Sequence, residues 1–138
     1  MMKKATLFWL SVCGLALTLF PNPSTAKPDL LVSGILVLDD DFIAIRIENA
    51  AEAEVAVAEE LRTKSFLTIF INGVNRAEYR FKYVDPTVFR KRSLVLVRTN
   101  FRAVSGLTVK AVVDPEAVIP ETNELNNARE KTFAANAR

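Results

Sequence analysis

Apolar and polar side chains alternate along several short stretches of this chain, and this period of two constrains the fold more than any other feature. Successive side chains of a β-strand point to opposite faces, so strict alternation predicts half-buried strands. Four segments alternate in this way: residues 43–47, 67–71, 79–83 and 107–113. Two shorter segments are rich in β-forming residues and a third is more polar: residues 30–38, 94–97 and 128–133. Together they predict about seven strands.

Turn-forming residues separate these segments. There are four such signals: three consecutive acids at 39–41, Asn72-Gly73, Asp85-Pro86 and Asp114-Pro115. Asn-Gly suits a tight hairpin because both residues tolerate positive φ, and proline ends a strand because it cannot donate to a sheet ladder. Many short strands without long intervening helices predict an all-β, antiparallel sandwich rather than a parallel sheet.

Residues 50–62 break the alternation and are rich in Ala and Glu. Asn49 and Glu52 resemble a capping box, in which two side chains satisfy the free N–H groups of a first helical turn. We therefore expect a short helix inserted between two strands here. The alternative is an extended edge strand over residues 55–57.

The first 26 residues have the order of an export signal. Two lysines give a positive start, residues 7–20 are apolar, and small residues precede a cleavage position after Ala26. The apolar stretch is shorter than the roughly 20 residues that span a membrane, which argues against a retained anchor. Cys13 leaves lipid attachment as another alternative, although Val12 is a poor residue before a modified cysteine. We expect cleavage near Ala26, no stable membrane insertion afterwards, and a periplasmic or extracellular protein.

Composition excludes several classes of function. The chain holds 18 Lys and Arg against 16 Asp and Glu, and loss of the leader would remove two lysines and leave a neutral remainder. That balance lacks the positive excess of a nucleic-acid binder. There is no His, and the one Cys lies in the leader, which removes the usual nucleophile–base pairs, zinc sites and disulfides. We expect no catalytic residue, no metal and no cofactor.

Charge is unevenly distributed along the rest of the chain. Residues 39–60 hold eight acids against Arg46 alone, whereas residues 76–102 hold eight bases against two acids. Two interpretations stay open: the two segments neutralise each other in space, or the second builds a basic face that binds an anionic partner. The candidate residues of that face are Arg90, Lys91, Arg92, Arg98 and Arg102.

Acids and amides collect near the C-terminus, and they form a second candidate group. Its members are Asp114, Glu121, Asn123, Glu124 and Asn126. Their oxygens are ligands that Ca²⁺ accepts, but the same side chains also bond nearby backbone groups in tight turns. The spacing does not match an EF-hand loop, so a hydrogen-bonded turn is the favoured interpretation and calcium the alternative.

Tyr79, Phe81 and Tyr83 would share one face of their predicted strand. Such a stripe is typical of a core, and carbohydrate stacking is the alternative. The free edges of a sandwich offer another binding mode, in which a partner peptide adds a strand.

The C-terminal third of the chain resembles a known family. Residues 113–127 read V-D-P-E-A-V-I-P-E-T-N-E-L-N-N, which resembles the closing motif of the CARDB family, the cell-adhesion-related domains of bacteria. Residues 28–32 resemble the opening strand of that family, and residues 47–50 resemble its V-x-N-x-G turn without the glycine. The resemblance covers about residues 28–133. It implies a seven-stranded, immunoglobulin-like β-sandwich that is exported and often repeated in large surface proteins.

We therefore expect a signal peptide over residues 1–26, a CARDB-like domain over 27–133 and a flexible tail over 134–138. The expected function is that of a non-catalytic module for protein contact or adhesion at the cell envelope. Its expected partner is an envelope or secreted protein and not nucleic acid. The alternative is a module that binds an anionic glycan or surface, with calcium stabilisation as a further option.

Overall fold

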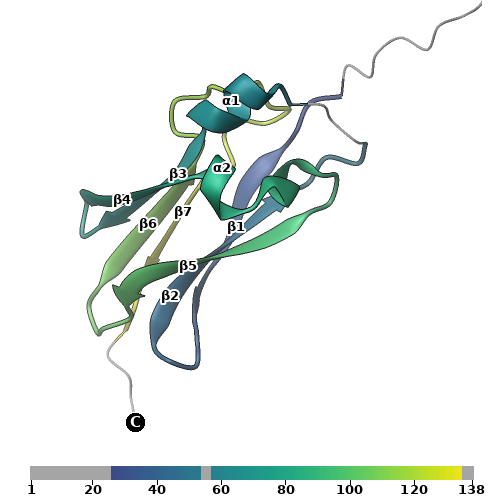
Figure 1. Cartoon of the computed structure of the whole chain (residues 1–138). Coiled ribbons are helices and arrows are strands. Elements are labelled where there is room, and N and C mark those ends of the chain that lie inside the picture. The colour runs from purple at the N-terminus through teal and green to yellow at the C-terminus, as the bar shows by residue number, and fades with distance from the viewer. Residues whose placement is uncertain (1–25, 54–56, 135–138) are drawn as a thin grey trace, which may run out of the picture.

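The computed structural model describes residues 26–53 and 57–134, which form two antiparallel sheets packed face to face (Figure 1). One sheet has the order β1-β2-β5: β1 (Leu30–Val37), β2 (Phe42–Asn49) and β5 (Leu94–Arg102). The other has the order β4-β3-β6-β7: β3 (Phe66–Ile71), β4 (Val74–Arg80), β6 (Thr108–Val113) and β7 (Ala128–Thr132). Three short helical segments complete the described chain: α1 (Glu59–Lys64), α2 (Phe81–Val84) and η1 (Pro86–Phe89).

The predicted all-β antiparallel sandwich of about seven strands is confirmed. The predicted leader, apart from Ala26, and residues 135–138 of the predicted tail lie outside the described residues. Within the described residues, no helix is long and apolar enough to cross a membrane.

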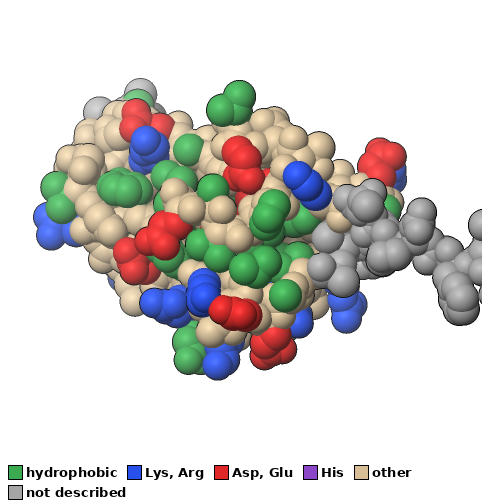
Figure 2. All heavy atoms as spheres, turned by 90° about the horizontal axis from the view of Figure 1, so that it is seen from above, with side chains coloured by type: hydrophobic (Ala, Val, Ile, Leu, Met, Phe, Trp, Pro, Cys, Tyr) green, Lys and Arg blue, Asp and Glu red, His purple; other side chains and the backbone are tan. Residues whose placement is uncertain are grey.

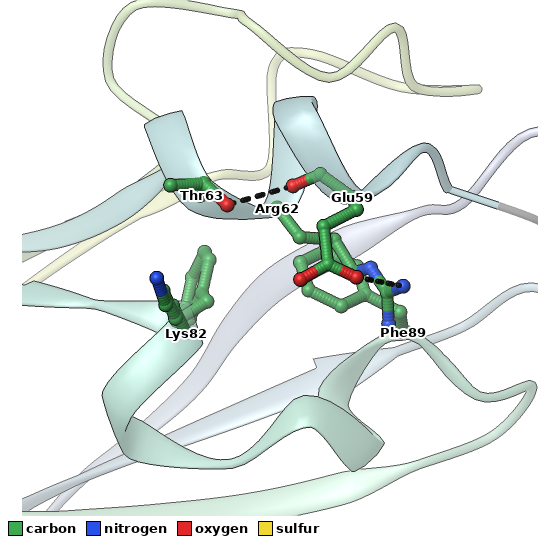
Figure 3. Close-up of a pocket in the computed structure, with 6 residues that line it drawn as sticks. Glu59, Arg62, Thr63, Lys82 and Phe89 are labelled. Atoms are coloured by element: carbon green, nitrogen blue, oxygen red, sulfur yellow. Dashed lines mark hydrogen bonds and ion pairs between the residues drawn. The ribbon is translucent and has the colours of Figure 1, made fainter.

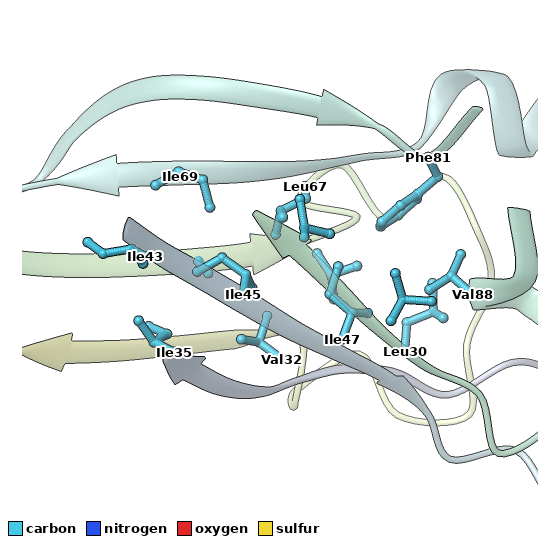
Figure 4. Close-up of a cluster of buried hydrophobic side chains, with 14 of the residues drawn as sticks. Leu30, Val32, Ile35, Ile43, Ile45, Ile47, Leu67, Ile69, Phe81 and Val88 are labelled. Atoms are coloured by element: carbon cyan, nitrogen blue, oxygen red, sulfur yellow. The ribbon is translucent and has the colours of Figure 1, made fainter. Parts of the chain in front are cut away.

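The core lies between the two sheets and consists mainly of inward side chains of the strands, joined by Val88 and Phe89 of η1 and by Ile119 (Figure 4). β2 contributes Ile43, Ile45 and Ile47, and β3 contributes Leu67 and Ile69, all with 0% exposure. Full burial of an aliphatic side chain of this size contributes roughly 1.5–3 kcal/mol. Because a chain with one Cys cannot form an internal disulfide, this apolar burial carries its stability.

Two tight turns have the backbone geometry that their sequences predict. In the turn between β1 and β2, Asp41 has a φ of 65°, and the Leu38 N–H donates to the Phe42 carbonyl at 2.8 Å. In the hairpin between β3 and β4, Asn72 has a φ of 49° and Gly73 a φ of 80°. Positive φ at both central residues matches the twist of the flanking strands.

The predicted alternating strand that contains Tyr79 is wrong beyond Arg80. Arg80 already pairs with the first residue of β3, so the chain leaves the sheet and forms α2. Phe81 then turns into the core and meets Phe89 edge to face, with ring centroids 5.7 Å apart. Tyr79 packs half-buried against the core as predicted, whereas Tyr83 is 77% exposed.

One of the two predicted proline stops is confirmed and the other is wrong. β6 ends immediately before Asp114-Pro115. Asp85-Pro86 instead begins η1, where the Asp85 carboxylate accepts the N–H of Thr87 at 2.8 Å and proline occupies the first turn. An aspartate followed by proline is also a good helix start, and here that role prevails.

The short helix expected between β2 and β3 is present, but it starts nine residues later than residue 50, at the beginning of α1. The capping box predicted at Asn49 is wrong. Asn49 is buried at the end of β2, where its Oδ1 accepts the N–H of Asp29 at 3.0 Å and that of Ala51 at 3.1 Å. Of the alternative strand over residues 55–57, only Val57 lies within the described residues, and it belongs to no strand.

Candidate functional site

The five basic residues of the candidate face follow one another along β5 and the turn before it. Arg90, Lys91 and Arg92 are exposed in the turn between η1 and β5. Arg98 and Arg102 lie on the outer face of β5, where exposed and buried side chains alternate. At about 3.3 Å per strand residue, the two groups stand roughly 20 Å apart. The structure therefore brings the five residues onto one element but separates them into two groups.

The second group is organised around one aromatic ring. The guanidinium carbons of Arg98 and Arg102 lie 4.5 and 4.7 Å from the ring centroid of Phe42, the first residue of β2. Both distances are within the range of cation–π attraction. Arg98 also bonds Asp40 in the turn between β1 and β2, and this hydrogen bond lowers the pKa of the Asp40 carboxyl. Arg102 has no ion pair among the described residues.

The turn before β5 is partly neutralised by acids. Arg92 forms an ion pair with Glu52 at 3.1 Å. Arg90 lies near Asp85, whose carboxyl pKa is lowered by its hydrogen bonds with Thr87 and, to a lesser degree, by the charge of Arg90. The turn therefore keeps part of its positive charge.

The acidic and basic segments of the sequence meet in space because β2 pairs with β5. Two ion pairs join them: Arg98 with Asp40, and Arg92 with Glu52. Figure 2, which views the molecule from above, also shows acidic and basic side chains interspersed, with hydrophobic side chains between them. Mutual neutralisation thus holds at these two pairs, while Lys91 and Arg102 stay without an ion pair in the described part of the chain.

Between the two basic groups, β5 exposes two leucines that the sequence analysis did not single out. Leu94 is 58% and Leu96 47% exposed, whereas Val95 and Val97 point into the core. The segment reads Leu-Val-Leu-Val, so both of its faces are apolar and its period of two does not show which face is buried. The sequence did contain one indication of an exposed apolar surface, which was a segment bounded by arginines with apolar residues on both of its faces.

A cavity of about 180 Å³ lies between α1 and the α2–η1 segment (Figure 3). Phe81 and Phe89 form its apolar lining, and Glu59, Arg62 and Lys82 supply charges around it. Arg62 reaches Glu59 at 3.6 Å, and the dashed line between their side chains in Figure 3 marks this ion pair. A space of this volume holds one side chain or a few waters.

The acids of the C-terminal candidate group are used inside the fold. Glu121 is 6% exposed; its Oε2 accepts the N–H of Leu30 at 2.5 Å, and its Oε1 accepts the side-chain amide of Asn127 at 2.9 Å. Asp114 is 2% exposed, and its Oδ2 accepts the N–H of Ile119 at 2.8 Å. These bonds tie the loop between β6 and β7 to itself and to the start of β1.

The remaining members of the group also make hydrogen bonds. Three bonds involve them: Glu124 Oε1 with the Glu121 N–H at 2.9 Å, Asn123 Oδ1 with the Leu125 N–H at 3.0 Å, and the Asn126 side-chain amide with Asp29 at 2.8 Å. Within residues 26–53 and 57–134, no three His, Cys, Asp or Glu side chains gather as a metal-binding group. The geometry is that of a hydrogen-bonded turn.

Burial changes the acidity of two of these carboxyls. Removal from water raises the pKa of Glu121 to about 8, against the opposing effect of its hydrogen bonds with Leu30 and Asn127. Burial also raises the pKa of Asp114. Both groups therefore favour the neutral form more than an exposed acid does.

Over the residues that the structure describes, the architecture and connectivity define the class: a seven-stranded, immunoglobulin-like sandwich. Comparison with solved structures then shows similarity to the CARDB domain of a protein from Pyrococcus furiosus. The crystal structure of that domain in complex with di-metal ions matches with a TM-score of 0.57 and 18% identity, over 80% of this chain and 90% of that one. A solution NMR structure of the domain matches with a TM-score of 0.50 and 17% identity, over 80% and 96% of the two chains.

At this level of identity the comparison shows a shared fold. The resemblance to CARDB domains noted in the closing motif is thereby confirmed for the fold of the chain. No family model and no curated protein matches the chain.

Proposed function

We propose that this chain is a non-catalytic interaction module that holds another protein at the cell envelope through β5 and the turn before it. The observation that carries the proposal is the pair of exposed leucines between two basic groups. Protein-binding surfaces combine an apolar centre with a polar rim, and arginine is enriched in them. The CARDB-like fold supports an adhesion-related role of this kind.

The use of the acids supports a non-catalytic role. Glu121 and Asp114, the two most buried acids of the C-terminal group, accept backbone N–H groups and so hold the loop together. The cavity beside α1 is small, and its acid Glu59 is paired with Arg62. Each of these side chains thus has a structural task.

Export is part of the same proposal. The positive start, the apolar stretch and the small residues before Lys27 support a signal peptide over residues 1–26 that is cleaved near Ala26. The interaction domain then spans residues 27–133, and the protein acts in the periplasm or outside the cell.

Affinity capture after crosslinking in the producing cell tests the proposed function. The full chain carries a C-terminal tag and is compared with the double variant Lys91→Glu/Arg102→Glu, which reverses two of the basic charges of this face that form no ion pair in the described fold. Arg76→Glu, on the exposed strand β4, is the matched control. We expect one dominant envelope protein that the control retains and the double variant loses. Absence of a captured protein, or capture unchanged by the double variant, would overturn the proposal.

A glycan- or anionic-surface-binding module is the second candidate, and the unpaired Lys91 and Arg102 favour it. Binding that rests on exposed charges weakens with salt, because they are screened within about 8 Å at physiological ionic strength. Binding to an immobilised anionic polysaccharide would then fall steeply between low and high salt. Binding that does not depend on salt would exclude this candidate.

The di-metal complex of the Pyrococcus furiosus domain raises the question of metal binding by this chain, and the residues of the closing loop do not fit it. Both oxygens of Glu121 face N–H donors, which compete with a cation for the same lone pairs. In the closing loop, three buried oxygens have no partner among the described residues; they belong to Asp114, Asn126 and Asn127. Ca²⁺ takes about six to eight oxygen ligands, so these atoms are too few.

A further inference from the structure

We propose that β5 binds its partner by strand addition: an extended segment of the partner, with apolar side chains flanked by acids, pairs with the free edge of β5 along residues 94–98. The inference rests on the proposed function. It specifies which edge is used and what the partner segment looks like.

The backbone of β5 presents unused donors and acceptors along one side. β5 is an edge strand whose sheet neighbour is β2. The Asn49 N–H donates to the Ser93 carbonyl at 3.0 Å, so this pair is one of the hydrogen-bonded pairs of the β2–β5 ladder. Such pairs alternate with non-bonded ones, and the register therefore makes Val95 and Val97 bonded to β2 as well. The backbone groups that point away from β2 are the N–H and C=O of Leu94, Leu96 and Arg98.

The edge on the opposite side of the sandwich is covered. There β1 lies beside β7, and two long side chains of β7 reach its backbone. Arg129 donates to the Ser33 carbonyl, and Lys131 donates to the Ile35 carbonyl at 3.2 Å. Acceptors on β1 that a partner strand would need are therefore already in use.

β4 is the other open edge, and it is less suited to pairing. Its register with β3 shifts between Asn75 and Ala77, and its exposed side chains include Arg76 and Glu78, of opposite charge. Bulges and mixed charges are means by which natural proteins discourage pairing at an edge. From Leu94 to Arg98, β5 pairs with β2 in regular register and contains neither proline nor an acid.

The outer face of β5 determines the chemistry of the added strand. Along this face the order is a basic turn, Leu94, Leu96 and then Arg98. Side chains directly opposite on paired strands lie close together, so apolar residues suit the leucines and acids suit the flanking bases. A second copy of β5 would bring more arginines and no acid, so like charges would disfavour pairing between copies.

Hydrogen–deuterium exchange with a synthetic peptide tests the inference. The probe carries Glu, Val, Val and Glu at alternate positions with Thr between them, and the control probe carries Lys in place of Glu. Added to the full chain, the Glu peptide is expected to slow exchange of the Leu94, Leu96 and Arg98 amides and not those of β4. The Lys peptide is expected to bind about tenfold or more weakly. Protection elsewhere, or equal binding of the two peptides, would overturn the inference.

A proline at the free edge supplies the matched variants. Leu96→Pro removes an N–H that has no partner in the described fold, and proline is tolerated at such edge positions. Glu78→Pro is its counterpart on β4, because the Phe81 N–H bonds the Ser65 carbonyl and the same alternation leaves the Glu78 N–H outside the sheet. We expect Leu96→Pro to abolish peptide binding and Glu78→Pro to retain it. The opposite pattern would overturn the inference.

Three further comparisons keep the test decisive. If circular dichroism shows that Leu96→Pro is unfolded, Arg98→Glu replaces it and is expected to reduce the preference for the Glu peptide over the Lys peptide, because one of the two flanking basic groups becomes acidic. A preference unchanged by Arg98→Glu would count against binding at the β5 edge. Capture of an envelope protein that Leu96→Pro does not affect would leave the proposed function standing and refute strand addition alone. If exchange of the β5 amides slows at high chain concentration in the absence of peptide, the edge instead binds a second copy of the chain.

Discussion

Glu121 is the side chain in which burial and ionisation conflict most strongly. It is an acid with 6% exposure, and burial raises its pKa to about 8 from the usual 4.5. The folded chain therefore holds a proton at Glu121 over a pH range in which the unfolded chain has released it. The resulting stabilisation is fully present below about pH 4.5 and is lost as the pH rises through about 8. Asp114 acts in the same direction.

We predict that the free energy of unfolding falls between about pH 5 and pH 8, with a slope of up to about 1.4 kcal/mol per pH unit from Glu121. Glu121→Gln is expected to flatten most of that slope, because the amide stays neutral and the unpartnered Oδ1 of Asn127 can accept from it after rotation of the Asn127 amide. Urea unfolding of both proteins across this range measures the effect. Parallel pH profiles would show that the proton is not held at Glu121.

Core truncation gives a second prediction at this scale. Ile45 is fully buried in β2, so Ile45→Ala is expected to lower the free energy of unfolding by about 2–5 kcal/mol. Val37→Ala is the control, since that side chain is 45% exposed and its loss is expected to cost less than about 0.5 kcal/mol. Equal costs in chemical denaturation would contradict the assignment of the core.

At the scale of elements, local patterns predicted the strands and turns well wherever one face is polar. Residues 43–47 and 67–71 alternate, and both lie in strands of the sandwich. The prediction failed at α2 because the alternation continues beyond Arg80, where β3 has no further residue to pair with. The end of this strand is set by its neighbour in the sheet, which the local sequence pattern does not show. The helix in the β2–β3 connection was predicted, but its bounds were not, because the capping signal at Asn49 serves a different set of N–H groups.

The hairpin turn between β3 and β4 offers a test of a local prediction. Gly73 has a φ of 80°, and a Cβ built there meets nothing within 4 Å. The cost of Gly73→Ala is therefore conformational rather than steric, and we expect about 1–2 kcal/mol. Gly73→Asn is expected to cost less, because asparagine tolerates this region. Thermal unfolding measures both, and an alanine variant as stable as the parent would contradict the turn geometry.

The closing loop offers another test at this scale. Its acids accept N–H groups, so we predict that excess calcium and a chelator give the same melting temperature at constant ionic strength. A ligand that binds the folded state at a hundred times its Kd would stabilise it by about 2.7 kcal/mol. A clear rise with calcium, absent with magnesium, would show that the loop binds the ion and that its hydrogen bonds rearrange.

At the scale of the whole molecule, the edges of the sandwich differ from one another, although the charge of the chain is nearly balanced. One side of the sandwich is tied by the β7 side chains Arg129 and Lys131, and the other leaves β5 open. The sequence indicated the arginines of that region, but two facts needed the fold: the partial pairing of these arginines with acids across β2, and the outward position of Leu94 and Leu96. Runs of charged residues in the sequence show which charged side chains a region contains. Only the strand order shows which other side chains lie between them in space.

Site-specific photocrosslinking in the producing cell tests directly whether β5 is the binding surface. A photoreactive residue is placed at Leu96 in one protein and at Glu78, on the open edge of β4, in another. We expect position 96 to form a covalent adduct with one envelope protein and position 78 to form none with it. Equal adducts from both positions, or adducts from position 78 alone, would contradict the assignment of β5 as the binding surface.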